Sequence, residues 1–398
     1  MSTLSDTTLS ESCYFHPMIN YESKLPPVGT SIFAIMSKLA QENNAVNLGQ
    51  GFPDYEISSK LKDLVDKYVQ QGKNQYAPMP GLLSLRETLS KKYNLSYNCN
   101  INPESEITIH TGATQAIFTA IMAFVKRDDE VIIMEPAYDC YLPTIILAEA
   151  KPIGIPVTAP DFKIDWNKVK EQISDKTRMI IINNPHNPIG KILVREDMLA
   201  LQEIVKDKNI IVLSDEVYEH LIYDEMQHQS VLAYPELALQ SIAVYSFGKT
   251  FHATGWKMGY SIAPDYLMKE MRNVHQWNVF SVNSFLQEAL NDFLQDPEEY
   301  HKLPSFFQRK RDLFKEALSQ SKLRPLHCAG TYFQLYDYSE MSDLSDVEFA
   351  KWLVSHHGVA TIPISPFYSG KNEAKVVRFC FAKDDRTLLA AADKLSVI

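Results

Sequence analysis

Seven short apolar segments alternate with helical patterns between residues 105 and 262, and this alternation constrains the fold more than any other feature of the sequence. Parallel strands need long crossover connections, which are usually helices, so the alternation is typical of an α/β sheet buried on both faces. We therefore predict a mostly parallel seven-stranded sheet flanked by helices. The predicted strands are residues 107–110, 131–134, 152–157, 179–182, 210–213, 242–245 and 260–262.

The pattern changes after this region, which indicates a second, smaller domain. A long helix is predicted over residues 265–294, and the mixture of helices and short strands after it is typical of an α+β unit. We expect an N-terminal arm (1–30), a large α/β domain (47–289) and a small α+β domain (31–46 with 290–398). The predicted elements of the small domain are helices over 32–41 and 306–319 and strands near 332–335 and 376–381.

Composition and charge exclude several classes of function. The 398 residues include 39 basic and 49 acidic side chains, a formal net charge of −10, so the chain repels phosphate polymers and no nucleic-acid partner is expected. We expect no membrane segment, because no apolar run is long enough to span a bilayer, and we see no signal peptide. The five cysteines form no CxxC pair, and we find no set of metal ligands at suitable spacing. A reducing, cytoplasmic location without a metal site is the expectation.

The most informative polar stretch is SFGKTFHATGWKMG, which follows the predicted strand 242–245. Lys249 comes directly after the strand end, where a lysine is poorly placed for a solvated charge, and a lysine held in a cleft can lose its proton and attack a carbonyl. Ser246 adds a hydroxyl and Lys257 a second cation. Together they suit a phosphate beside a Schiff-base lysine. The alternative is a surface loop with two lysines; a P-loop is not supported, because Ala243 stands where its motif needs glycine.

Polar residues also follow two other predicted strands. The carboxyl ends of parallel strands are where α/β sheets bind ligands. At these ends Asp215 can pair with a buried cationic ring nitrogen, Tyr218 can donate to an oxygen on the same side, and the Asn187 amide can bind a ligand oxygen. The alternatives are a metal site at the Asp215-Glu216 pair and a simple turn at Asn187.

Three further residues are candidates for the same binding site. Thr114 lies in TGATQA, a strand–helix junction whose N–H groups can bind an anion. Tyr138 can stack on a planar ring, and Arg378 lies in an apolar strand where a substrate carboxylate is a suitable partner. An ordinary helix cap, a core aromatic residue and a structural ion pair are the alternatives. All the groups together are what pyridoxal phosphate requires of a protein.

The chain from about residue 25 to residue 395 resembles the class I/II pyridoxal-phosphate aminotransferases, which have the PLP-dependent transferase fold type I. Within that group it is most similar to the methionine aminotransferases, which are related to the kynurenine and glutamine aminotransferases. The resemblance rests on these segments, which occur in the family's order: NLGQGFPDY, NQYAPMPGLLSLR, EPAYDCY, NNPHNPIGK, SDEVYEH, SFGKTFHATGWKMGY and VRFCFAKDD.

The resemblance implies a role for each site residue. Lys249 would bind the cofactor aldehyde covalently and act as the base, Asp215 would pair with the ring nitrogen, and Tyr218 and Asn187 would bond the ring's phenolic oxygen. Tyr138 would stack on the ring. The residues implied for the phosphate are Ala113, Thr114, Ser246 and Lys257, with Tyr76 reaching in from a neighbouring subunit.

The resemblance also implies a substrate site and a homodimer with active sites at the subunit interface. Arg378 would bind the α-carboxylate, helped by Asn187 and the Gly51 backbone. Phe33 and Phe280 match aromatic pocket positions, Phe280 being supplied across the dimer.

The implied reaction moves the α-amino group of methionine, or of aromatic and other large neutral amino acids, to a 2-oxo acid by a ping-pong mechanism. A kynurenine/glutamine aminotransferase with cysteine-conjugate β-lyase side activity is the alternative. Ser281 departs from the kynurenine branch, in which a histidine follows the matching phenylalanine, and this departure argues against kynurenine.

Two rival classes fit less well. Transcription regulators with an aminotransferase-like domain carry an additional DNA-binding domain, and the polar arm of about thirty residues has no room for a helix-turn-helix. A nicotinamide enzyme would open its sheet with GxGxxG, which is missing here.

Overall fold

A computed structural model describes residues 22–25 and 29–398, so most of the predicted arm lies outside the described residues. The helices are α1 (Ile32–Glu42), α2 (Ser59–Gln70), α3 (Leu83–Tyr97), α4 (Ala113–Phe124), α5 (Tyr141–Leu147), α6 (Trp166–Glu171), α7 (Arg195–Val205), α8 (Pro235–Ala238), α9 (Phe247–Thr250), α10 (Asp265–Asn278), α11 (Ser284–Phe293), α12 (Glu298–His301), α13 (Leu303–Ala317), α14 (Asp346–Trp352) and α15 (Asp385–Leu395), with short turns η1 (Val231–Ala233), η2 (Thr254–Trp256), η3 (Leu353–His357) and η4 (Ser365–Phe367). The strands are β1 (Val46–Asn47), β2 (Ile107–His110), β3 (Glu130–Glu135), β4 (Lys151–Pro156), β5 (Thr177–Asn183), β6 (Ile211–Asp215), β7 (Ser241–Ser246), β8 (Gly259–Ile262), β9 (Arg324–Pro325), β10 (Phe333–Asp337), β11 (Val359–Ala360), β12 (Ile362–Pro363) and β13 (Val376–Cys380).

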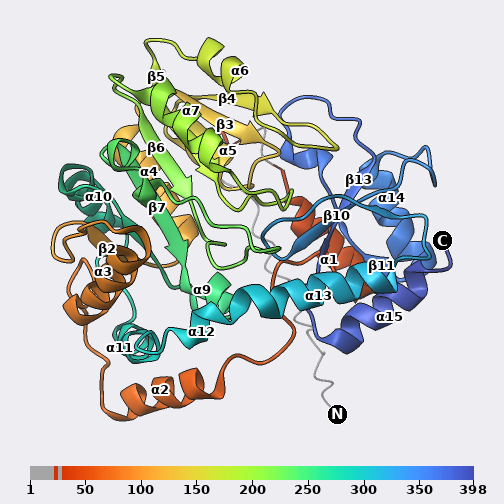
Figure 1. Cartoon of the computed structure of the whole chain (residues 1–398), viewed down its shortest axis with the longest axis horizontal. Coiled ribbons are helices and arrows are strands. Elements are labelled where there is room, and N and C mark those ends of the chain that lie inside the picture. The colour runs from red at the N-terminus through yellow and green to blue at the C-terminus, as the bar shows by residue number, and fades with distance from the viewer. Residues whose placement is uncertain (1–21, 26–28) are drawn as a thin grey trace, which may run out of the picture.

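The seven predicted strands form one sheet in the order β2-β8-β7-β6-β5-β3-β4 (Figure 1). Strand β8 is antiparallel to both of its neighbours, and the other pairs are parallel. The prediction of a mostly parallel seven-stranded α/β sheet is therefore confirmed.

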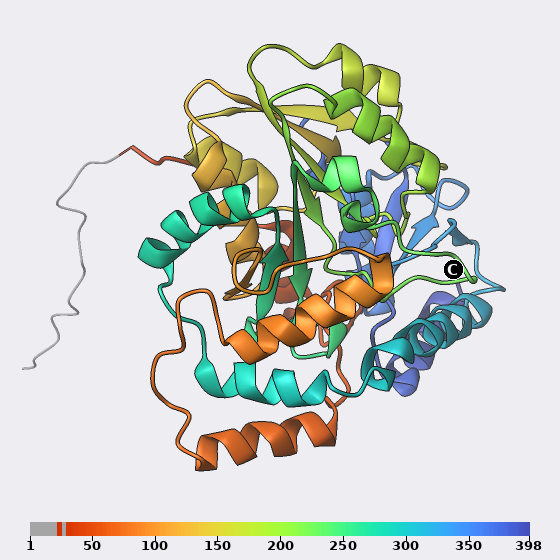
Figure 2. The ribbon, with the colours of Figure 1, turned by 60° about the vertical axis from the view of Figure 1, so that its left-hand side comes forward.

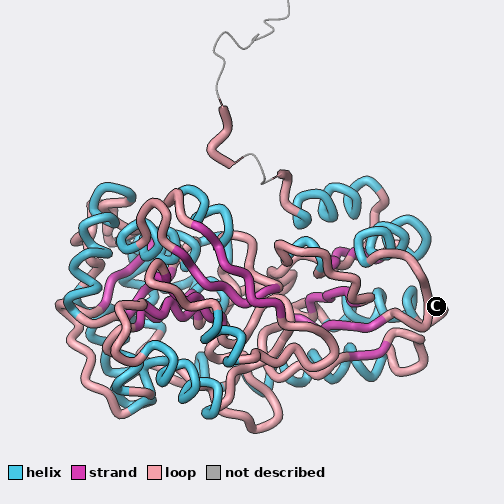
Figure 3. The backbone as a smooth tube through the Cα atoms, turned by 90° about the horizontal axis from the view of Figure 1, so that it is seen from above, coloured by secondary structure: helices cyan, strands magenta, loops and turns pink. Residues whose placement is uncertain are grey.

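Both faces of this sheet are buried, as the continuous apolar strands require. In β7, Ile242 and Val244 pack with α4 and α10 on one face, and Ala243 and Tyr245 contribute to the core on the opposite face. Helices accordingly lie on both sides of the strands (Figure 3). On the second face, α11 packs against both α2 and α3 (Figure 2).

A second, antiparallel sheet has the order β12-β13-β10-β9, and β1 forms a separate parallel pair with β11. Helix α1 packs against β11 and β12, so a segment near the start of the sequence lies among elements from its last quarter (Figure 1). This arrangement is compatible with a small unit built from both parts of the chain, and the exact boundaries 31–46, 47–289 and 290–398 remain a prediction.

The prediction of one long helix over residues 265–294 is wrong. The chain forms α10 and α11 with a break between them, where Phe280 adopts a left-handed conformation with φ of +67°. The break lets α11 turn and pack on α2, and Ser281 donates a hydrogen bond to the Ala77 carbonyl at 2.9 Å. Tertiary contacts thus override the local helical pattern.

In the described part of the chain, no helix combines the length and apolar character that crossing a membrane requires.

Candidate functional site

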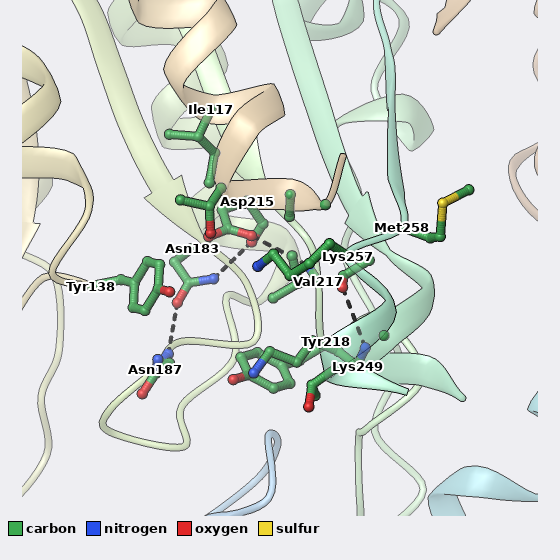
Figure 4. A pocket seen from close by; sticks show the side chains of 16 residues that line it. Ile117, Tyr138, Asn183, Asn187, Asp215, Val217, Tyr218, Lys249, Lys257 and Met258 are labelled. Atoms are coloured by element: carbon green, nitrogen blue, oxygen red, sulfur yellow. Dashed lines mark hydrogen bonds between the residues drawn. The ribbon is translucent and has the colours of Figure 1, made fainter. Parts of the chain in front are cut away.

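Most of the predicted polar residues converge on one cavity at the carboxyl edge of the large sheet (Figure 4). They lie at or just after the carboxyl ends of five strands of the sheet, which is why residues far apart in the sequence meet there. Nine of the predicted site residues line the cavity: Ala113, Thr114, Tyr138, Asn187, Asp215, Tyr218, Ser246, Lys249 and Lys257.

One end of the cavity is formed by the start of α4 and the start of β8. Because the first N–H groups of a helix have no helical partner, Ala113 and Thr114 present donors and a partial positive charge there. Gly112 has φ of +80°, and a side chain at Gly259 would lie 2.8 Å from the Ala113 nitrogen, so glycine is needed for this close approach. Lys257 lines the same cavity. The combination suits an anion such as a phosphate.

Lys249 lies in α9, directly after β7, and its amine points into the cavity (Figure 4). The Nζ atom donates hydrogen bonds to the Tyr332 hydroxyl at 3.0 Å and to the Gly51 carbonyl at 3.3 Å. Burial lowers the pKa of Lys249 to about 8; the charges of Arg378 and Lys257 lower it too, and Cys380 and Asp215 oppose the change. A substantial neutral fraction of the amine is therefore present near neutral pH, as a nucleophile or base requires.

Asp215 ends β6 and is almost completely buried, with 3% of its surface exposed. The Tyr141 hydroxyl donates to its Oδ2 at 2.6 Å, and the Val217 amide donates to its Oδ1 at 3.4 Å. Burial raises the pKa of Asp215 to about 6, and these hydrogen bonds act in the opposite direction. A buried carboxylate of this kind is stabilised by a cationic partner on the cavity side.

A chain of hydrogen bonds connects Asp215 to Arg378. The Asn183 side-chain amide donates to the Asp215 carbonyl at 2.8 Å, and its Oδ1 accepts from the Asn187 amide at 2.7 Å. Arg378 then donates to Asn187 Oδ1 and to the Gly49 carbonyl, both at 2.8 Å. These bonds fix the guanidinium relative to the end of β6.

The Arg378 side chain is buried, and no charged partner contacts it within the described residues. Its guanidinium carbon lies 3.8 Å from the Phe333 ring centroid and 5.1 Å from that of Phe33, and its buried Nε has no hydrogen-bond partner in the described part of the chain. Burial lowers the pKa of Arg378 to about 10. A ligand carboxylate would supply the missing charge and acceptor.

The remaining predicted residues lie outside the cavity; some contact the site, and others lie elsewhere. Gly51, Phe33 and Arg378 are not among the residues that line the cavity. Gly51 accepts from Lys249, and Arg378 donates to the lining residue Asn187 and lies against the Phe33 ring. Tyr76 and Phe280 lie elsewhere, with exposed fractions of 83% and 50% and ring centroids 5.5 Å apart. A role for these two residues in the cavity thus depends on a second copy of the chain.

Sequence reasoning missed three residues of the site: Tyr141, Asn183 and Tyr332. Tyr141 ends the motif EPAYDCY, and Asn183 begins the motif NNPHNPIGK. In these motifs, only Tyr138 and Asn187 are assigned roles from the sequence. The sequence predicts only a strand that begins near Tyr332; in the structure this residue precedes β10, and its hydroxyl accepts a hydrogen bond from Lys249. Only a long-range contact identifies it, because Gly51 and Lys249 lie 281 and 83 residues away.

Comparison with known proteins gives one family and close relatives. The family model described as "Aminotransferase class I and II" matches residues 43–395. A methionine aminotransferase of Escherichia coli is 46% identical over 94% of this chain and 97% of that protein. The kynurenine–oxoglutarate transaminase 3 of mouse is 35% identical over 93% and 88% of the two chains. A crystal structure of an Escherichia coli protein with a reported methionine aminotransferase function superposes with a TM-score of 0.94 at 45% identity, covering 96% of this chain and 100% of that chain.

Proposed function

Because this chain belongs to the aminotransferase class I and II family, we propose that it transfers the α-amino group of methionine, and of other large neutral amino acids, to a 2-oxo acid. Aminotransferase activity follows from the family, which uses pyridoxal phosphate. The choice of methionine rests on the 46% identity to the bacterial methionine aminotransferase over nearly the whole of both chains.

The cavity residues fit pyridoxal phosphate by their chemistry. The observation that carries the proposal is the buried amine of Lys249, which faces the cavity together with the buried carboxylate of Asp215. We assign the aldehyde to Lys249, the ring nitrogen to Asp215, the phenolic oxygen to Tyr218 and Asn187, and the ring face to Tyr138. The phosphate is assigned to Ala113, Thr114, Ser246 and Lys257, with Tyr76 of a second copy.

When bound, pyridoxal phosphate supplies an aldehyde that exchanges amines and a ring that accepts the electron pair released at Cα. The residues of this chain do the rest. Arg378 and Asn187 hold the α-carboxylate and so aim the Cα–H bond at Lys249. The Lys249 amine, with its lowered pKa, would take up that proton and deliver it to the former aldehyde carbon of the cofactor. Asp215 would supply a negative charge to the ring nitrogen, which would favour a proton there.

The exposed positions of Tyr76 and Phe280 support a homodimer. Both aromatic rings belong to the predicted site but lie outside the cavity of their own chain. In a dimer with active sites at the subunit interface, they would complete the site of the other subunit and bury their exposed surface.

A kynurenine/glutamine aminotransferase is the second candidate, favoured by the 35% identity to the mouse kynurenine–oxoglutarate transaminase. This alternative includes β-elimination from cysteine conjugates, which needs only a leaving group on Cβ. Release of pyruvate from such a conjugate without an added 2-oxo acid would reveal this side activity.

The test uses purified protein loaded with pyridoxal phosphate and a panel of amino acids, including methionine, phenylalanine, glutamine and kynurenine. Methionine should convert the cofactor absorption from that of the aldehyde form to that of the amine form fastest, and a 2-oxo acid should restore it. A protein that stays colourless with pyridoxal phosphate would contradict the proposal.

Borohydride reduction locates the reactive amine in the same preparation. Reduction should attach the cofactor covalently to the peptide that contains Lys249. The Lys249→Ala variant should still bind the cofactor through its phosphate, but its turnover should fall by roughly three orders of magnitude. Attachment to another lysine, or near-normal turnover of Lys249→Ala, would refute the assigned role.

A further inference from the structure

Two groups accept hydrogen bonds from the amine of Lys249. The family resemblance implies neither of them as a partner of this lysine. Its Nζ atom lies 3.0 Å from the hydroxyl oxygen of Tyr332 and 3.3 Å from the carbonyl oxygen of Gly51. The Tyr332 hydroxyl in turn donates to the Gly51 carbonyl at 2.7 Å. The three polar groups thus form a closed triangle.

The direction of these bonds decides what the hydroxyl does. Because the Tyr332 proton is directed to Gly51, the lone pairs of its oxygen remain for the N–H groups of Lys249. Tyr332 therefore accepts from the lysine and favours its protonated form, against the effect of burial.

The triangle is rigid because its two acceptors are fixed by the fold. Tyr332 is completely buried, its backbone carbonyl accepts from the Phe381 amide at 3.0 Å, and its ring packs edge-on against Tyr218 at 5.2 Å. Gly51 approaches Phe333 so closely that a Cβ would lie 2.8 Å from the ring. A long, flexible lysine side chain thus meets a preformed pair of acceptors.

We propose that Tyr332 is a positioning residue, whose hydroxyl, oriented by the Gly51 carbonyl, holds the free Lys249 amine at the place where it exchanges protons with the substrate. This inference rests on the proposed function, because it concerns the lysine while it acts as a base. It adds a residue and a backbone carbonyl to the proton-transfer machinery.

The other ionisable groups around Lys249 come from several elements. Cys380 and Arg378 lie on β13, Asp215 ends β6 and Tyr218 follows it, Asp139 precedes α5, and Lys257 precedes β8. All of them remain when only the Tyr332 hydroxyl is removed. Tyr332→Phe therefore isolates the hydroxyl, and it also keeps the aromatic packing.

Strand β10 offers a matched control. Tyr336 is as buried as Tyr332, and its hydroxyl has no hydrogen-bond partner within the described residues. Tyr336→Phe removes the same atom from the same region without touching Lys249.

The first measurement uses the apoenzyme and does not depend on catalysis. The rate at which an amine-directed acylating reagent modifies Lys249 is followed against pH by peptide mass spectrometry. In Tyr332→Phe the midpoint should fall by about one pH unit, because the ammonium form loses an acceptor. In Tyr336→Phe it should not move.

The second measurement uses the loaded enzyme. Tyr332→Phe should lower kcat for methionine by about tenfold, with little change in KM, because the amine is held less well while carboxylate binding is intact. A Lys249 midpoint and a kcat equal to those of Tyr336→Phe would overturn the inference.

If Tyr332→Phe does not fold, 3-fluorotyrosine at position 332 replaces it. The fluorine makes the oxygen a poorer acceptor and keeps the hydroxyl, so the midpoint should fall by a smaller amount, and an unchanged midpoint would count against the inference. Borohydride mapping in the unmodified enzyme tests the proposed function separately, so the two failures are distinguishable.

Discussion

The Tyr141 hydroxyl donates a 2.6 Å hydrogen bond to Oδ2 of Asp215, the acid at the end of β6. Asp215 is otherwise a buried carboxylate with a weak bond from the Val217 amide. Tyr141 therefore helps to keep a charge in a place where burial opposes it. Removing this contact should therefore change how the site responds to pH.

Tyr141→Phe should raise the pKa of Asp215 further above its ordinary value, because the carboxylate form loses a donor while burial remains. Because the role that we propose for Asp215 requires the ionised carboxylate, the acidic limb of kcat/KM for methionine should move to higher pH. A pH–rate profile measures this movement. Tyr336→Phe is the control, and a profile identical to that control would contradict the role of Tyr141.

Asp215→Asn should stabilise the apoenzyme at neutral pH, although it should abolish turnover. The folded pKa of about 6 exceeds the value of 3.8 for an unperturbed carboxyl, so the folded state binds the proton more tightly. The free energy of unfolding of the apoenzyme therefore falls as pH rises from about 4 to about 6. Above that range the buried, ionised carboxylate lowers it by about 3 kcal/mol.

Urea unfolding of the Asp215→Asn and unchanged apoenzymes tests whether the substitution stabilises the protein. The variant should unfold at higher urea than the unchanged protein at pH 7, and the difference should shrink toward pH 4. Equal midpoints at pH 7 would show that the buried charge is compensated in the apoenzyme.

Arg378→Ala should reduce kcat/KM for methionine by roughly 100-fold, because the α-carboxylate loses two charge-assisted hydrogen bonds. Pyridoxal phosphate uptake should be preserved. Methionine amide, which lacks the carboxylate, is the matched substrate: its slow reaction should be nearly the same in both proteins. An equal loss for the amide would mean that Arg378 acts through the fold of the site instead.

Tyr76 can be tested by combining two defective subunits. A hybrid dimer of Lys249→Ala and Tyr76→Ala chains, isolated with two affinity tags, contains one intact site if Tyr76 acts across the interface. It should then have about half of the activity of the unchanged dimer. Activity no higher than that of the Tyr76→Ala homodimer would place Tyr76 in its own subunit's site or remove it from catalysis.

Strand ends carried most of the information about the site. Asp215, Asn187 and Lys249 lie at or after the ends of three neighbouring parallel strands, and the topology of such sheets brings strand ends together. Apolar runs likewise identified all seven strands of the large sheet, because both of its faces are buried. These properties are local in sequence, so they can be read before the structure is known.

Contacts between distant segments could not be predicted in this way. The break at Phe280 occurs in NVFSVN, which contains neither glycine nor proline, and it depends on how α11 packs on α2. The contact of Tyr332 with Lys249 depends on a third segment, at Gly51. Neither feature has a pattern of its own in the sequence.

The pairing of β1 with β11 has a consequence for synthesis of the protein. Val46 pairs with Val359, and the Leu48 and Gly49 carbonyls accept hydrogen bonds from the Cys380 amide and from Arg378. A ribosome must therefore translate as far as β13 before these early carbonyls find their partners. A nascent chain that already contains Lys249 still lacks the strand that carries the guanidinium, so the proposed substrate site can form only after β13 has been made.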